Sequence, residues 1–162
     1  MTPFADAIRR HFQPTLAMLA SCVEECPESA WEAAEGNTPI WEHVFHAAVW
    51  LDDWMRTPDQ EFHPPSFFSE AALNLEPNAQ PVASREQMRA YVAQVADKCR
   101  RLLSSVNDDL LLKEVEIMGG RFALADQALA QMRHVLYHAG CVSAILQRYT
   151  QRAIPWSGFR EG

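Results

Sequence analysis

Apolar residues recur at intervals of three and four along four segments of the chain, which is the period of an amphipathic helix. The segments run from about Pro3 to Cys26, from about Pro39 to Arg56, from Ser84 to about Ser104, and from about Ala123 to Thr150. Pro3 suits a first helical turn, and the sequence SREQ at 84–87 predicts a capping box at the start of the third helix. The only strand-like alternation, Val115 and Ile117 before two glycines, permits a short hairpin.

Four long helices with little strand predict an all-α protein, a four-helix bundle formed by residues 1–162 as a single domain. The connection from about Thr57 to Ala83 contains five prolines and is unusually long for a compact domain. A connection of this length can cross the whole bundle and return the chain to its starting end. We therefore expect the third helix to run parallel to the second, which gives an up-down-down-up order with a long crossover.

Composition and charge narrow the classes of function. The net charge is −7 over 162 residues, and the basic residues are scattered, so nucleic-acid binding is not expected. No apolar run approaches the roughly 20 residues that span a bilayer, and the first residues lack the apolar core of a signal peptide. We expect no membrane association, a cytoplasmic location, and four cysteines that stay free thiols.

Histidines interrupt two of the predicted apolar helices. His43 and His46 lie three apart on the second helix, and His134 and His138 lie four apart on the fourth. Residues at these spacings share a helix face, so His134 and His138 can bind one ion, with a third ligand from His43 or His46. Three neutral ligands would leave positions open for water or substrate, as in catalytic metal sites. The alternative is that the rings pack in the core with satisfied nitrogens.

Other chemistries fit the sequence less well. No His has Glu three residues before it, as a di-iron bundle requires, and there is no H-E-x-x-H, G-x-S-x-G, P-loop or G-x-G-x-x-G motif. Asp53 lies seven residues beyond His46 and could orient an imidazole, although solvation of Asp52 and Asp53 is the simpler expectation.

The second helix, IWEHVFHAAVWLDDWM, and the last, ALAQMRHVLYHAGCVSAILQRY, together resemble the DinB-like (YfiT-like) superfamily. The resemblance implies a four-helix bundle with the long crossover and a divalent metal, nickel or zinc, held by three histidines. It assigns the ligands to His46, which is followed by two alanines, and to His134 and His138. His43 then becomes a neighbour of the site or an alternative ligand. Cys141, where members often carry a polar residue, is a small core residue, a reactive thiol or a fourth ligand.

The resemblance implies a metal-dependent enzyme with a small-molecule substrate, and two chemistries are open. In a thiol-dependent transferase the metal holds a low-molecular-weight thiol as the attacking thiolate, and in a hydrolase it activates water. By analogy we favour thiol transfer. A bundle that binds metal or a small molecule without turnover is the alternative from another class, and we also allow for a homodimer.

Overall fold

The computed structural model describes residues 2–57, 60–77, 79–117 and 120–158. It is predominantly helical, which confirms the predicted all-α class. Four long helices, α1 (Pro3–Glu24), α2 (Ile40–Trp54), α4 (Arg85–Ser105) and α6 (Leu124–Thr150), form the body of the protein. Shorter helical elements are η1 (Glu28–Ala30), α3 (Glu70–Leu73) and α5 (Asp108–Leu112).

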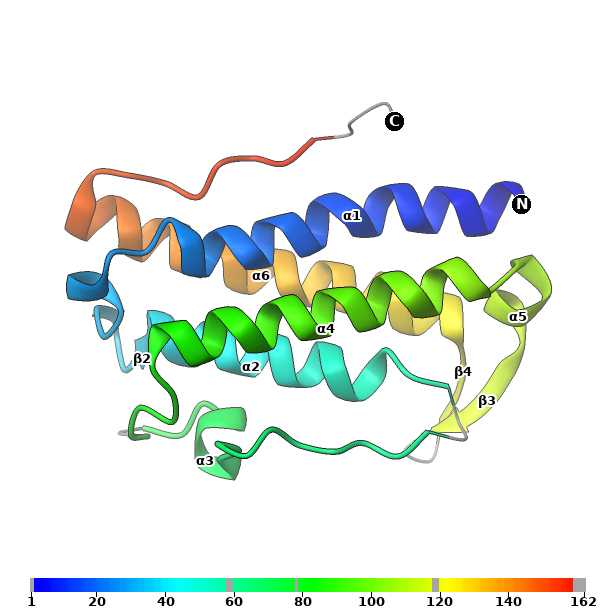
Figure 1. Ribbon diagram of the computed structural model, residues 1–162, viewed down its shortest axis with the longest axis horizontal. Helices are drawn as coiled ribbons and strands as arrows, with labels where there is room; N and C mark the ends of the chain where they lie inside the picture. The colour runs from blue at the N-terminus through cyan, green and yellow to red at the C-terminus, as the bar shows by residue number, and fades with distance from the viewer. Residues whose placement is uncertain (1, 58–59, 78, 118–119, 159–162) are drawn as a thin grey trace.

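The four long helices form a bundle in which each packs mainly against two neighbours. α1 packs between α6 and α4, and α2 packs between the same two helices on the other side. Figure 1 shows α1 and α6 running in one direction and α2 and α4 in the other. The segment between α2 and α4, which includes α3, travels back along the length of α2 before α4 begins (Figure 1).

One hydrophobic core joins the four helices. Its largest fully buried side chains include Phe12 and Leu16 of α1, Trp41 and Phe45 of α2, and Ile145 of α6. α2 is apolar on almost every side, because α4, α6 and the crossover all cover it. Polar side chains on α2 are therefore forced into contact with neighbouring elements, which makes its histidines structurally informative.

Local sequence signals account for how the elements begin. The predicted capping box is present: the Ser84 hydroxyl accepts from the Gln87 N–H at 3.2 Å, and Gln87 Oε1 accepts from the Ser84 N–H at 2.9 Å. β3 (Glu114–Ile117) pairs antiparallel with β4 (Gly120–Ala123), so the permitted hairpin is confirmed, although residues 118–119 lie outside the described residues. A second, smaller pair joins β1 (Ala34–Glu35) to β2 (Thr38–Pro39) just before α2.

Candidate metal centre

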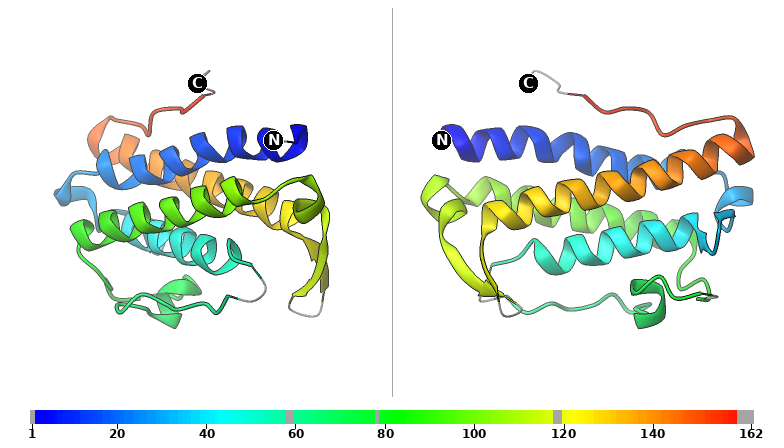
Figure 2. Two further views of the ribbon diagram at one scale, coloured as in Figure 1. Left: turned by 45° about the vertical axis from the view of Figure 1, so that its right-hand side comes forward. Right: turned by 180° about the vertical axis from the view of Figure 1, so that it is seen from behind.

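The four singled-out histidines meet in the interface between α2 and α6. The two helices run antiparallel, so residues early in α2 face residues late in α6 (Figure 2). His43 lies opposite His138, with their Nδ1 atoms 3.0 Å apart, and His46 lies opposite His134, with their Nε2 atoms 2.9 Å apart. Sequence spacing predicted that each pair shares a helix face, and the packing of α2 on α6 brings the two faces together.

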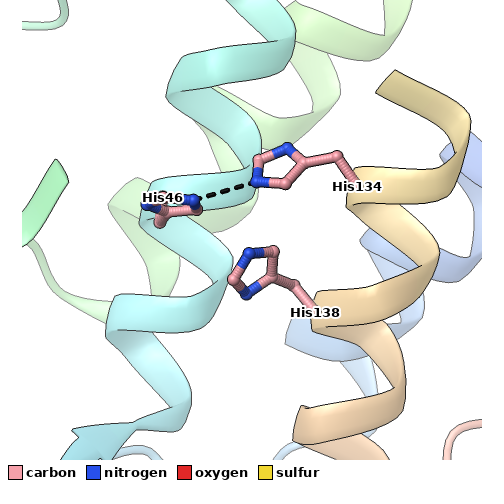
Figure 3. A group of neighbouring side chains, drawn as sticks. All are labelled: His46, His134 and His138. Atoms are coloured by element: carbon pink, nitrogen blue, oxygen red, sulfur yellow. Dashed lines mark hydrogen bonds between the residues drawn. The ribbon is translucent and has the colours of Figure 1, made fainter. Parts of the chain in front are cut away.

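Three of these rings converge on one point. His46, His134 and His138 each offer a ring nitrogen, and these atoms all lie within 4.8 Å of one another. The ring centroids are 4.6 Å (His46 to His138), 4.7 Å (His134 to His138) and 4.9 Å (His46 to His134) apart. Figure 3 shows the three side chains pointing toward one another from α2 and α6. Two nitrogens that bind one tetrahedral Zn²⁺ at about 2.1 Å lie about 3.4 Å apart, so small side-chain rotations suffice to reach that geometry.

The His46 ring is oriented by the crossover. Its Nδ1 lies 2.6 Å from the Leu73 carbonyl oxygen at the end of α3, and because a carbonyl only accepts, Nδ1 must carry the proton. His46 Nε2 is then left with a lone pair directed at His134. Ligating histidines are usually held by an acceptor of this kind on their other ring nitrogen. The proposed role of Asp53 as that acceptor is wrong, since Asp53 pairs with Arg56 instead.

The other two rings have partners on their Nδ1 atoms as well. His134 Nδ1 lies 3.4 Å from Oε1 of Gln131, a buried residue one turn earlier on α6. His138 Nδ1 faces His43 Nδ1, so in the tautomer with the proton on Nδ1 His138 donates a hydrogen bond to His43, and His138 Nε2 is free. All three rings can therefore present Nε2 while Nδ1 is engaged elsewhere.

Burial keeps these histidines neutral. It lowers the pKa of His138 to about 3 and the pKa values of His134 and His43 to about 4, with smaller contributions from the neighbouring imidazoles. Burial also lowers the pKa of His46, while the hydrogen bond to the Leu73 carbonyl raises it by a smaller amount. At neutral pH each ring is in the uncharged form that binds metals.

The three imidazole ligands suit a divalent transition-metal ion of intermediate softness. Three imidazole nitrogens are the ligands that zinc, nickel and copper favour, whereas magnesium and calcium take oxygen ligands. With both Nδ1 atoms protonated, His46 and His134 aim two lone pairs at each other across 2.9 Å, an arrangement that a cation between them stabilises. In the metal-free state the same contact requires the His134 tautomer with its proton on Nε2, whereas metal binding requires the tautomer with the proton on Nδ1.

Cys141 and His43 lie outside the converging group. Among the described residues, that group consists of the three histidines and does not include Cys141. Cys141 is a half-buried free thiol, while Cys22, Cys26 and Cys99 are fully buried free thiols. His43 is 8% exposed and contacts His138 rather than the point where the other three converge.

A buried acid beside His43 was not anticipated from the sequence. Glu42 is 1% exposed, its Oε1 has no hydrogen-bond partner among the described residues, and burial raises its pKa to about 7. The periodicity of the second helix could have revealed it, because nearly every neighbouring position is apolar.

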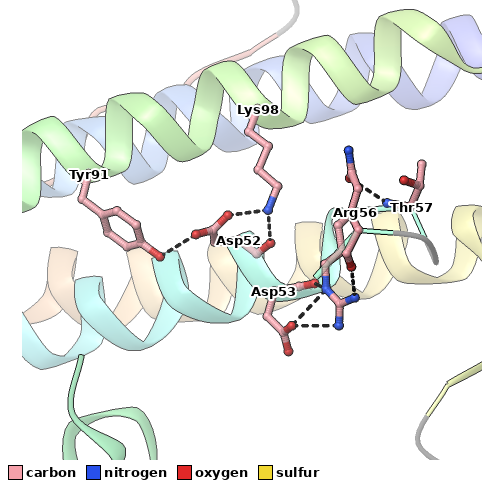
Figure 4. A network of polar contacts seen from close by, with 7 residues as sticks. Asp52, Asp53, Arg56, Thr57, Tyr91 and Lys98 are labelled. Carbon is pink, nitrogen blue, oxygen red and sulfur yellow. Dashed lines mark hydrogen bonds and ion pairs between the residues drawn. The ribbon is translucent and has the colours of Figure 1, made fainter. Parts of the chain in front are cut away.

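Asp52 belongs to a structural network on the side of α2 that faces α4. Its carboxylate accepts a hydrogen bond from the Tyr91 hydroxyl at 2.9 Å and pairs with the Lys98 ammonium (Figure 4). The Asp52 side chain is 14% exposed, so the expectation that it is solvated is wrong. The contacts fix α2 against α4 and so hold the helix that carries His43 and His46.

Comparison with known families agrees with this architecture. The helical fold and the three-histidine group fit a helical bundle with a metal site, and the profile of the DinB superfamily matches residues 11–142. The chain belongs to the DinB superfamily. No curated protein matches it. None of the helices in the described part of the chain has the length and apolar character needed to cross a bilayer.

Proposed function

We propose that His46, His134 and His138 bind one divalent ion, nickel or zinc, and that the protein is a metal-dependent enzyme acting on a small molecule. The observation that carries the proposal is the convergence of three imidazoles whose Nδ1 atoms all have partners. Histidines that only pack in a core need a hydrogen-bond partner for one ring nitrogen each. Packing alone does not require their other ring nitrogens to point to a common centre.

Thiol transfer is the reaction that we favour. A bound divalent ion supplies Lewis-acid stabilisation of an anionic ligand in its open coordination positions. A thiol with a pKa near 8.5 needs far less stabilisation than water, whose pKa is about 15.7, to be ionised at neutral pH. Among the described residues, the converging group contains no carboxylate that could act as a general base toward a water molecule. Hydrolysis is the alternative reaction.

The residues of the chain have separable roles in this proposal. His46, His134 and His138 hold the ion, and Leu73, Gln131 and His43 orient them. Trp50, whose ring lies 6.3 Å from that of His46, borders the site one turn further along α2. The half-buried Cys141 is three residues beyond His138 and can contact a substrate without ligating the ion.

The test is a reaction screen with purified protein loaded with nickel or zinc. Low-molecular-weight thiols are combined with an electrophilic aromatic acceptor, and loss of free thiol is followed. Thiol consumption that depends on metal and disappears in His134→Ala supports thiol transfer, with exposed His63→Ala as the matched control. Turnover of ester substrates without thiol consumption would instead establish the hydrolase.

Two further expectations accompany the proposal. We expect a cytoplasmic location, which fractionation of cells tests, and a homodimer, which analytical ultracentrifugation tests. A monomer at micromolar concentration would contradict the second expectation without affecting the metal site.

A further inference from the structure

A cavity of about 330 Å³ lies between the end of α2 and the start of α6, the two helices that also carry the converging histidines. Its lining includes Ala130, which lies one helical turn before His134, and Trp54, which lies two turns after His46. Phe122 of β4 also lines it. Figure 2 shows the β3–β4 hairpin standing beside these two helix ends.

The walls of the cavity suit a flat apolar group. Trp54, Phe122 and Leu129 supply aromatic and aliphatic surface, and Phe122 is 38% exposed although it faces the cavity. Aromatic side chains bind planar rings through stacked or edge-on contacts. The volume is ample for a substituted benzene ring, since an engineered cavity of about 150 Å³ accepts benzene itself.

One charged group in the lining is free to bind an anion. Arg133 is exposed, and within the described part of the chain its guanidinium has no ion pair or hydrogen bond. The other charged residue in the lining, Asp126, has a structural partner. Its carboxylate accepts a hydrogen bond from the Ala123 N–H at 2.9 Å and caps the start of α6. A guanidinium binds a carboxylate through two parallel hydrogen bonds, which gives orientation as well as attraction.

We infer that this cavity is the binding site for a small aromatic carboxylate, whose ring lies between Trp54 and Phe122 and whose carboxylate pairs with Arg133. The inference rests on the proposed function, because it makes this compound the substrate of the three-histidine site. Ala130 lies about 6 Å along the helix axis from His134, so the inferred site and the three-histidine group are about one helical turn apart on α6.

The experiment measures binding to the metal-free protein by NMR, so that it does not depend on activity. The probes are 4-nitrobenzoate and its neutral amide, 4-nitrobenzamide, titrated into ¹⁵N-labelled protein. The variants are Arg133→Gln and, as a matched control, Arg101→Gln, which removes another exposed arginine, on α4. Both sites are on the surface, and the spectra report directly whether each variant is folded.

We expect the amides of Phe122, Ala130 and Arg133 to shift, with 4-nitrobenzoate binding about tenfold more tightly than the amide. Arg133→Gln should abolish this preference, and Arg101→Gln should retain it. Absence of saturable shifts up to about 10 mM probe, or an unchanged preference in Arg133→Gln, overturns the inference. Selective binding by a protein that holds no metal would refute the proposed function alone, and metal binding without a response to the probes would refute the inference alone.

Discussion

Replacement of His43 separates a residue that orients a ligand from one that binds the ion. His43 Nδ1 lies 3.0 Å from His138 Nδ1 and accepts a hydrogen bond from its N–H when His138 presents Nε2. His43→Leu keeps a similar volume at this buried position but removes the acceptor. His43→Asn places a carbonyl oxygen close to where Nδ1 now lies and so restores the acceptor.

The size of the effect follows from this contact. Loss of a group that orients a ligand costs about 10- to 100-fold in metal affinity, which corresponds to about 1.4–2.7 kcal/mol. We expect a loss in this range for His43→Leu and affinity within about threefold of the parent for His43→Asn. His138→Ala removes a ligand and should lose more than about 1,000-fold.

The assay is competition for Zn²⁺ against a chromophoric chelator, with thermal unfolding of each metal-free variant as the check on folding. His43→Leu that binds as tightly as the parent would show that the contact with His138 contributes nothing. His43→Leu that loses as much as His138→Ala would show that His43 is itself a ligand. Either result refutes the division of roles between His43 and His46.

Three further predictions concern stability of the metal-free protein. Burial raises the pKa of Glu42 from 4.5 to about 7, so ionisation of its carboxyl lowers the free energy of unfolding as the pH rises through this range. The variant Glu42→Gln should therefore be about 1–3 kcal/mol more stable than the parent at pH 8 and little more stable at pH 4. An equal gain at both pH values would contradict this. The lowered pKa values of His43, His134 and His138 contribute stability that is present above pH 6.5 and lost toward pH 4. Urea unfolding should therefore show that the free energy of unfolding falls by at least about 3 kcal/mol between pH 7 and pH 4. A free energy of unfolding that does not change with pH would argue against neutral buried rings. Tyr91→Phe removes the hydroxyl that donates to Asp52 and should cost about 1–2 kcal/mol in the same assay, with no loss refuting its part in holding α2 to α4.

The sequence predicted the features that depend on local periodicity. The helices, the capping box at Ser84 and the grouping of histidines on shared helix faces all follow from residues within a few positions of one another. The contact of Gln131 with His134 could have been predicted in the same way, since Gln131 lies three residues before His134 on the same helix. The superfamily membership was also predictable, because motif order and spacing extend over most of the chain.

The features that the sequence did not reveal depend on contacts between distant segments. The acceptor for His46 is a backbone carbonyl, and a carbonyl is present at every residue, so no residue type could mark Leu73. Asp52 was misjudged because its partners, Tyr91 and Lys98, lie on another helix about forty residues away. The contact of His43 with His138 required knowledge of how α2 and α6 are aligned.

Metal stoichiometry of the purified protein and its single histidine variants tests the central claim most directly. After loading with nickel or zinc and dialysis, elemental analysis should find one ion for each chain in the parent and in His63→Ala, and none in His46→Ala, His134→Ala or His138→Ala. A parent protein that holds no ion, or full retention of the ion in any of those three variants, would contradict the three-histidine site.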